Sequence, residues 1–391
     1  MNNDININDE AIQELLKNKI RVAINGCGRI GRAFIRMASH YDNIEIVAVN
    51  DLSDIDNMAY LLQYDTVYKT APFISEVEKV SDSEQYLSIA CPADGDNYAE
   101  DKVMRIRYLS QKDTALYPWG EMDVDVVVES TGLFTNYEKA AIHIERGARR
   151  VVISAPVKDA RNENADATAG DNSTDSESAA SSVHGETVLM RINDDLLRGC
   201  AITSNASCTT NASSPVIAIL NEAIGIEKAI LNTVHSYTAS QSIVDGPNKK
   251  DWREGRAAAQ NIVPSSTGAA IAVTKAIPEL EGNFDGISIR VPTPAGSIAD
   301  ITFITKRNTT IEEINSILTE AGDSDRWRGI FMATDEELVS SDIIGLTHAS
   351  IVDLKMTRVV GGNLVKVLAW YDNEAGYTNT LIEHVIKAGN V

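Results

Sequence analysis

The sequence predicts an α/β fold built on a parallel sheet with crossover helices, because apolar strand patterns alternate with helical patterns in its first part. KIRVAING, residues 19–26, is typical of a buried strand that runs into glycines, and RAFIRMAS follows it at helical spacing. IEIVAVND then indicates a second strand. We therefore expect residues 19–51 to form one strand–helix–strand unit.

The same alternation returns further along the chain. VDVVVESTG (124–132) has a strand pattern, YEKAAIHIERGA is helical, and RRVVISAP (149–156) has a strand pattern again. A repeated unit of this kind predicts further parallel strands in the same sheet. Residues 1–18, ahead of the first strand, indicate a short amphipathic helix of no readable function.

Length and charge narrow the class of protein. The 391 residues suit two domains, and no apolar run reaches the roughly 18 to 20 residues that span a bilayer. The first residues lack the basic and apolar regions of a signal peptide, which favours a cytoplasmic protein. The net charge of −21 disfavours nucleic acid as a partner, so an anionic substrate would need a local basic pocket.

The cysteines are too few and too scattered for a disulfide framework or a zinc site. This usage fits a reduced compartment, and we expect no metal. The four are Cys27, Cys91, Cys200 and Cys208.

The composition changes between residues 159 and 185. This stretch is rich in Ser, Ala, Asn and Asp and has few large apolar side chains. Such a segment buries too little apolar surface to offset the entropy cost of ordering, so we expect a mobile surface loop. A phosphorylated or partner-binding segment is the alternative.

A glycine motif lies between the first strand and the first helix. Gly26, Gly28 and Gly31 have the spacing G-x-G-x-x-G, and Asp51 ends the second strand. In this context the glycines let the backbone approach a pyrophosphate at the helix N-terminus, while the carboxylate binds ribose hydroxyls and repels a 2′-phosphate. The motif predicts a Rossmann-type domain that prefers NAD to NADP; a tight turn beside a solvated aspartate is the alternative.

SNASCTTNASSP, residues 204–215, places Cys208 where a loop becomes a helix. A thiol becomes an effective nucleophile when its pKa falls, which a helix N-terminus and a neighbouring imidazole both favour. His235, at the end of the strand-like run LNTVH, is the candidate base. The two side chains can meet only through the fold, and on these residues alone a buried structural thiol is an equally good interpretation.

Six stretches, in one order, carry a resemblance to a known family. They are INGCGRIGR, SNASCTTN, HSYTASQ, VDGPNKKDWREGRAAAQNIVPSSTGAA, IRVPTP and WYDNEAGY. Together they resemble phosphorylating glyceraldehyde-3-phosphate dehydrogenase, over residues 19–391 apart from the segment 159–185. The resemblance implies a Rossmann-type NAD domain and an α+β catalytic domain with a mostly antiparallel sheet.

The resemblance also implies an activity: oxidation of glyceraldehyde 3-phosphate to 1,3-bisphosphoglycerate with NAD and inorganic phosphate, in glycolysis or gluconeogenesis. Cys208 is then the attacking thiolate and His235 its base, with the substrate phosphate near Thr238 and Arg290. The residues implied for the attacking phosphate are Ser207, Thr209, Thr267 and Gly268. Those implied for the cofactor are Gly26, Gly28, Arg29, Ile30, Gly31, Asp51, Thr131, Gly132 and Asn373. For each hydroxyl, an ordinary turn or cap role is the alternative.

Three positions depart from the family pattern. Cys27 stands where the family usually has phenylalanine, Ala212 where it has a second cysteine, and Ala375 where it has the tryptophan of NEWGY. The loss of the tryptophan puts cofactor affinity or the packing of the last helix in doubt. Two other functions are considered: an erythrose-4-phosphate dehydrogenase, and a catalytically silent NAD-binding scaffold.

The resemblance implies the domain limits as well: an N-terminal extension over 1–18, an NAD-binding domain over 19–207, a catalytic domain over 208–370, and a C-terminal helix over 371–391 that returns to the first domain. On that helix, His384 is expected at the surface. A homotetramer is implied too, with the segment 238–262 near subunit contacts.

Overall fold

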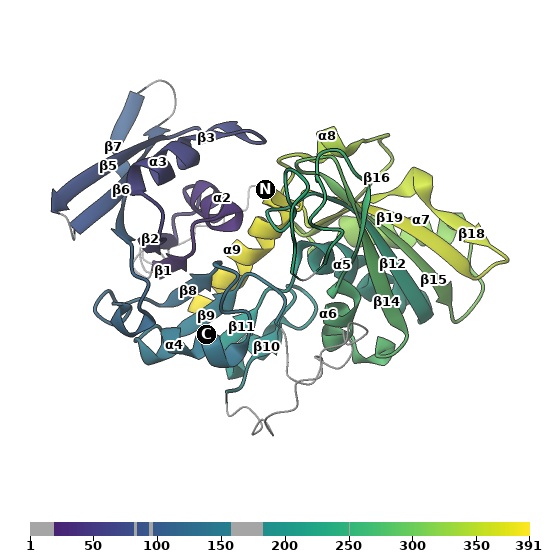
Figure 1. The fold of residues 1–391 in the computed structure, drawn as a ribbon. Coiled ribbons are helices and arrows are strands. Elements are labelled where there is room, and N and C mark those ends of the chain that lie inside the picture. The colour runs from purple at the N-terminus through teal and green to yellow at the C-terminus, as the bar shows by residue number, and fades with distance from the viewer. Residues whose placement is uncertain (1–18, 82–83, 94–96, 158–182, 250) are drawn as a thin grey trace, which may run out of the picture.

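The computed structural model describes residues 19–81, 84–93, 97–157, 183–249 and 251–391 (Figure 1). The helix expected over 1–18 and nearly all of the loop expected at 159–185 lie outside the described residues. Two large sheets form the two halves of the molecule, and α9 (Ala375–Gly389), in yellow, lies in the middle of the view. No helix in the described part of the chain is long and apolar enough to cross a bilayer.

The first sheet is mostly parallel, which confirms the predicted α/β class. β1 (Ile20–Asn25) pairs in parallel with β2 (Ile44–Asn50) on one side and with β8 (Val126–Glu129) on the other. The chain builds outward on one side of β1 and then returns to the other, so the carboxyl ends of β1 and β8 border the crevice at which such sheets bind ligands. Within the described residues the strand order is β10-β11-β9-β8-β1-β2-β7-β6-β5. The remaining strands are β9 (Arg150–Ile153), β10 (Glu186–Thr187), β11 (Ile202–Ser204), β7 (Asn97–Leu109) and the antiparallel edge strands β6 (Glu84–Ala93) and β5 (Ile74–Ser81).

The second sheet is mixed and mainly antiparallel, as the family resemblance implied. β12 (Ile226–Ser236) pairs in parallel with β14 (Phe284–Val291) and antiparallel with β15 (Ser297–Thr305), whose side chains alternate between buried and half-buried. The strand order is β13-β14-β12-β15-β19-β17-β16, and β18 pairs with β19. The other strands are β13 (Val263–Ser266), β16 (Phe331–Thr334), β17 (Ser350–Asp353), β18 (Arg358–Val360) and β19 (Leu364–Tyr371), and a separate hairpin joins β3 (Tyr64–Asp65) to β4 (Lys69–Thr70).

Several helices begin at a short polar side chain that accepts hydrogen bonds from the first-turn amides, which would otherwise lack partners. These capped helices are α3 (Ile55–Gln63) after Asp54, α4 (Tyr137–Glu145) after Asn136, α5 (Cys208–Ile224) after Ser207 and α7 (Ile311–Gly322) after Thr310. The other α-helices in the described part of the chain, besides α9, are α2 (Arg29–Ala38), α6 (Ala269–Ala276) and α8 (Ser340–Ile343).

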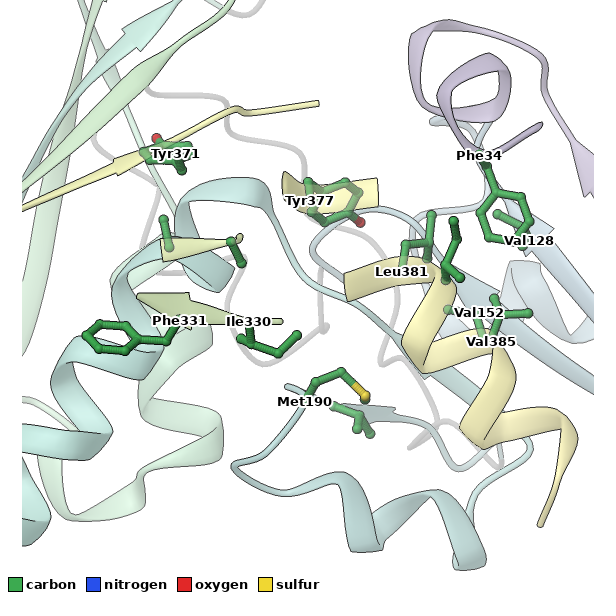
Figure 2. Packing of buried hydrophobic residues seen from close by; sticks show 14 of the residues in the cluster. Phe34, Val128, Val152, Met190, Ile330, Phe331, Tyr371, Tyr377, Leu381 and Val385 are labelled. Atoms are coloured by element: carbon green, nitrogen blue, oxygen red, sulfur yellow. The ribbon is translucent and has the colours of Figure 1, made fainter. Parts of the chain in front are cut away.

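Helix α9 packs on the first sheet, although it follows the last strand of the second. Leu381 and Val385 are fully buried and face Phe34 of α2 and Val128 and Val152 of the sheet (Figure 2). Each such aliphatic side chain contributes about 1.5 to 3 kcal/mol when fully buried. The last helix therefore stabilises the half of the molecule that holds the glycine motif.

The expectation that His384 lies on the surface of this helix was wrong, because its side chain is 0% exposed. Its Nδ1 lies 3.1 Å from Asn205 Oδ1 and its Nε2 lies 2.8 Å from Thr203 Oγ1. These two polar partners satisfy the ring inside the protein, and burial lowers the pKa of His384 to about 3. The neutral ring ties α9 to the segment that leads to Cys208.

Candidate active site

The turn between β1 and α2 is shaped by its glycines. Gly26 has φ of +94°, and a Cβ there would lie 2.6 Å from the Thr131 amide nitrogen. A Cβ on Gly31 would overlap the Gly26 carbonyl oxygen, so this glycine lets helix and strand pack closely. A Cβ on Gly28 would meet nothing within 4 Å. The turn is thus closed on its inner side and open at Gly28, which fits the close approach of a pyrophosphate.

Asp51 follows β2 at the same edge of the sheet. Its Oδ2 accepts from the Cys27 amide at 2.7 Å and its Oδ1 from the Ser53 amide at 2.9 Å. Each oxygen keeps capacity for another hydrogen bond, so the carboxylate both closes the glycine turn and fits the hydroxyls of a ribose. Cys27 itself is buried, and burial raises its pKa to about 12, which makes that thiol unreactive.

The side chain of Arg29 faces two carboxylates. Its Nε donates to Glu374 at 2.8 Å, and a second nitrogen binds Asp65. The hydrogen bond that Arg29 donates to Glu374 is the main cause of a raised pKa for Arg29. Arg29 therefore connects the glycine motif to the start of α9, next to buried Ala375, whose amide donates to Asp372 at 2.9 Å.

The structure brings Cys208 and His235 together from separate elements. Cys208 is the first residue of α5, and His235 lies near the end of β12. Cys208 Sγ is 3.3 Å from His235 Nε2, a distance at which the thiol and the imidazole form a hydrogen bond. A helix N-terminus and an imidazole thus meet at one sulfur, the arrangement that a nucleophilic thiol needs.

Protonation of this pair depends on burial and on Arg290. Burial lowers the pKa of His235 to about 3, and the Arg290 charge adds to that effect. Burial also raises the pKa of Cys208, while Arg290 opposes the shift. Both shifts favour a thiol beside a neutral imidazole in the resting site.

Arg290 competes with the Ser236 carbonyl for the same ring nitrogen of His235, Nδ1. His235 Nδ1 lies 2.6 Å from the Ser236 carbonyl oxygen and 2.8 Å from Arg290 Nη1. One ring nitrogen cannot donate to a carbonyl and accept from a guanidinium at once, so the two hydrogen bonds are alternatives. An anion that draws Arg290 away would leave Nδ1 to donate to Ser236 and Nε2 to take the thiol proton.

The hydroxyls of the site have partners within the protein. Ser207 Oγ accepts from the Thr210 amide at 3.0 Å and caps α5, and Thr267 Oγ1 accepts from the Ala269 amide at 3.2 Å at the start of α6. Thr209 is buried, and its Oγ1 lies 2.9 Å from the Tyr371 hydroxyl. The Thr209 hydroxyl is thereby held inside the protein. The Ser207 cap and the Thr267 turn fit the ordinary cap or turn role that the sequence left open for these hydroxyls.

The remaining candidates lie on three different segments. Thr238 Oγ1 is 3.1 Å from Ser240 Oγ on the segment after β12, and Gly268 is the N-cap residue of α6. Asn373 follows β19 and is buried, and its Oδ1 accepts from Ser297 Oγ at 3.2 Å. That hydrogen bond orients the Asn373 amide before any ligand binds.

Sequence reasoning missed three residues around the nucleophile. The ring of Tyr371 meets that of His235 edge-on, with centroids 5.9 Å apart. Ala206 has φ of +54°, unusual for a residue with a Cβ, and the Tyr377 hydroxyl donates to its carbonyl at 3.1 Å. Tyr371 ends an apolar strand pattern and could have been noticed for that; nothing in the sequence marks Ala206.

The fold and the site together define a dinucleotide-binding enzyme with a cysteine beside a histidine at its centre. Comparison with known proteins is more specific. The family model for the NAD binding domain of glyceraldehyde 3-phosphate dehydrogenase matches residues 20–137, and the model for the C-terminal domain of that enzyme matches residues 207–373. The chain belongs to the glyceraldehyde 3-phosphate dehydrogenase family.

Full-length relatives agree with the family models. The chain is 42% identical to glyceraldehyde-3-phosphate dehydrogenase 1 of Nostoc sp., over 94% of this chain and 96% of the relative. It is 40% identical to glyceraldehyde-3-phosphate dehydrogenase 1 of Bacillus subtilis, over 95% and 99%. The predicted family, the NAD cofactor and the nature of the chain as an NAD-dependent glyceraldehyde-3-phosphate dehydrogenase are confirmed.

Proposed function

We propose that this chain oxidises and phosphorylates glyceraldehyde 3-phosphate to 1,3-bisphosphoglycerate, with inorganic phosphate as second substrate. The observation that carries the proposal is the 3.3 Å contact between Cys208 Sγ and His235 Nε2, with Arg290 beside the ring. A nucleophile, a base and a cation that can hold a phosphate are the groups that this chemistry needs.

The covalent steps follow from these groups. Cys208 Sγ attacks the aldehyde carbon while His235 Nε2 takes the thiol proton and returns it to the aldehyde oxygen, which yields a hemithioacetal. His235 then accepts the hydroxyl proton as the carbon is oxidised to a thioester. NAD, when bound, supplies the hydride acceptor. A phosphate oxygen finally attacks the thioester carbon, the C–S bond breaks, and the sulfur regains a proton from His235.

Arg290 has two roles in this proposal. It holds the phosphate of the aldehyde substrate, together with Thr238, and by doing so it leaves His235 Nδ1. Loss of that contact and neutralisation of the arginine charge both raise the basicity of His235, because Arg290 lowers the pKa of His235 in the resting site. Proton transfer from Cys208 is then easiest when a phosphorylated substrate is present.

The attacking phosphate is proposed to bind near the N-termini of α5 and α6. Support comes from Ser207, which caps α5, and from Thr267 and Gly268, which lead into α6, because helix N-termini present amides that bind anions. Thr209 contributes through its backbone, since its hydroxyl binds Tyr371.

For the cofactor, we propose that the pyrophosphate lies on the open side of the glycine turn at Gly28, Arg29 and Ile30, with the ribose hydroxyls on Asp51. The oriented amide of Asn373 holds the nicotinamide carboxamide. Support comes from the space at Gly28 and from the fixed carboxylate of Asp51.

The domain limits, the assembly and the location are proposed as the sequence implied them: an NAD-binding part over 19–207, a catalytic part over 208–370, and a cytoplasmic homotetramer. Between residues 238 and 262, Ile243 and Trp252 are each 86% exposed, and Ile262 is 71% exposed. Such large apolar side chains favour cover by a second copy of the chain.

One assay tests the proposed reaction: NADH formation from glyceraldehyde 3-phosphate with and without inorganic phosphate. We expect sustained turnover only with phosphate, and none from Cys208→Ser. Erythrose 4-phosphate as substrate is the control, and we expect it to be the poorer substrate. Phosphate-independent turnover, or a preference for erythrose 4-phosphate, would contradict the proposal.

A further inference from the structure

A buried carboxylate lies at the crevice between β1 and β8, outside every role assigned above. Glu129 is 2% exposed and ends β8, directly opposite Asn25 at the end of β1. Among the described residues, the one positively ionisable side chain within ion-pair distance of it is His143. A carboxylate buried at this point, with no lysine or arginine to balance it, needs a full set of hydrogen bonds.

Glu129 has that set. Oε2 accepts from Asn25 Nδ2 at 2.6 Å and from His143 Nε2 at 3.0 Å. Oε1 accepts from the Thr131 amide at 2.8 Å and from the Thr131 hydroxyl at 2.5 Å. The Asn25 orientation is fixed in turn, because its Oδ1 accepts from Asn50 Nδ2 at 2.8 Å. Every neighbour is a donor, so the geometry suits the ionised carboxylate.

The position of the ring proton on His143 is also determined. The indole Nε1 of Trp119, which can only donate, lies 3.0 Å from His143 Nδ1. Nδ1 is therefore the acceptor, and the proton lies on Nε2, facing Glu129. The Tyr117 ring stacks on the imidazole with centroids 5.5 Å apart, which holds its plane.

These bonds join the two backbone segments that border the crevice. On one side Asn25 precedes Gly26, the glycine that packs against the Thr131 amide. On the other, the Thr131 hydroxyl donates to Glu129 and accepts from the Leu133 amide at 3.0 Å, which encloses Gly132 with its φ of +74°. The direction of the Thr131–Gly132 backbone is thus set by Glu129.

We propose that Glu129 is a positioning residue for NAD: its buried charge holds Thr131 and Gly132 against the glycine turn, and cofactor affinity depends on it. This inference rests on the proposed placement of Thr131 and Gly132 in the cofactor site. His143 and Trp119 act one and two hydrogen bonds further back, by keeping a donor directed at the carboxylate.

Glu129→Gln tests the proposal, because it keeps the shape but turns an acceptor into an NH₂ group that faces two donors. We expect the dissociation constant for NAD, measured by calorimetry on the cofactor-free protein, to rise at least about tenfold, the effect of unpaired buried donors. The KM for NAD should rise in parallel, while the KM for the aldehyde substrate and the alkylation rate of Cys208 without NAD stay unchanged.

Thr305→Val is the matched control. Thr305 is 2% exposed in β15, away from the crevice, and its hydroxyl donates to the Arg307 carbonyl at 2.7 Å. This variant should lower the melting temperature without changing NAD affinity. If Glu129→Gln only melted lower and bound NAD within twofold of the unmodified protein, Glu129 would be merely structural and the proposal would be wrong.

A second variant covers the case in which Glu129→Gln does not fold. Trp119→Phe leaves the carboxylate in place but frees His143 Nδ1 to take the proton, so Nε2 no longer has to donate to Glu129. NAD affinity should fall at least threefold; an unchanged affinity would overturn the proposal. If the unmodified protein bound NAD but failed the phosphate-dependent assay, the proposed reaction would fail while the affinity measurements on Glu129→Gln still decided this inference.

Discussion

Two strand-to-helix turns lie at the same edge of the first sheet, and they are built in opposite ways. The turn from β1 to α2, here the open turn, exposes its backbone at Gly28, where a Cβ would meet no other atom within 4 Å. The turn from β11 to α5, here the filled turn, is occupied by side-chain hydrogen bonds around Ala206. In the proposed function, the first turn admits the phosphates of NAD to its backbone amides, and the second holds the Cys208 sulfur in place. The turn proposed to bind the cofactor is therefore open to a ligand, whereas the turn that leads to the proposed nucleophile is occupied by the protein's own hydrogen bonds.

The hydrogen bonds of the second turn hold the backbone just before Cys208. The Ala206 amide donates to Ser204 Oγ at 3.0 Å, and its carbonyl accepts from Tyr377 of α9. Asn211, in the first turns of α5, donates back to the Asn205 carbonyl at 2.8 Å. These bonds come from before, after and far along the chain, so the direction of Cys208 is determined by the whole fold.

The largest effect on activity is expected from substitution of Cys208, which the filled turn positions, and of its partner His235. Cys208→Ser should abolish aldehyde oxidation, because a neutral hydroxyl is far less nucleophilic than a thiolate. His235→Asn should slow oxidation by about 10² to 10⁴, the usual contribution of a positioned base. Single-turnover NADH formation measures both. Both variants should still bind NAD, since the open turn is untouched; a serine variant with substantial activity would rule out the covalent route.

The glycine turn can be broken in two distinguishable ways. Gly31→Ala should unfold or strongly destabilise the first sheet, by about 3 kcal/mol or more, because its Cβ would overlap the Gly26 carbonyl with no flexible side chain to yield. Gly28→Ala should fold normally, since its Cβ meets nothing within 4 Å, yet weaken NAD binding at least about tenfold.

Thermal melts and calorimetry with NAD separate the two outcomes. Equal loss of stability in both variants would mean that Gly28 serves packing, and unchanged NAD affinity in Gly28→Ala would mean that the open space is not the cofactor's.

The contrast between the turns also explains what the sequence could predict. The open turn uses residues of one strand–helix–strand unit, so Gly26, Gly28, Gly31 and Asp51 could be predicted as a cofactor site from their spacing. The filled turn depends on partners more than 150 residues away, such as Tyr377, and no local pattern predicts those. Cys208 was predicted as the nucleophile from its position at a helix start and from family resemblance.

The error at His384 has the same origin. A histidine in an amphipathic helix is ordinarily exposed, and only the contact of α9 with Asn205 and Thr203 shows that its ring is buried and satisfied. The ion pair from Arg29 to Glu374 was likewise beyond sequence reasoning, because 345 positions separate the two residues.

The buried histidines behind the filled turn predict a dependence of stability on acid. The pKa values of His235 and His384 are both lowered to about 3 in the folded protein, against 6.5 for an unperturbed histidine. Between these values the unfolded chain binds protons that the folded chain does not, so stability is complete above about pH 6.5 and is lost as the pH falls toward 3. Each histidine contributes a slope of up to about 1.4 kcal/mol per pH unit.

His384→Gln isolates one of the two contributions, because an amide can also donate to Asn205 and accept from Thr203. Urea unfolding at a series of pH values from 4 to 7 should show a pH slope shallower by up to about 1.4 kcal/mol per unit than in the unmodified protein. An unchanged slope would mean that His384 is protonated in the folded state as well.

The smallest effect is expected at Ala206, and it bears most directly on the filled turn. Its φ of +54° costs an L-residue about 1 to 2 kcal/mol, which Ala206→Gly would remove. The same change loses a buried methyl and adds freedom to the unfolded chain, which together cost about as much. We therefore expect the free energy of unfolding to change by less than about 1 kcal/mol.

Ala212→Gly is the control. Ala212 is buried in α5 with helical backbone, so its substitution relieves no strain and should cost about 1 to 2 kcal/mol of unfolding free energy. Urea unfolding measures both variants. If the two substitutions lowered the free energy of unfolding equally, glycine would relieve no strain at Ala206, and the hydrogen bonds of the turn would hold Cys208 without backbone strain.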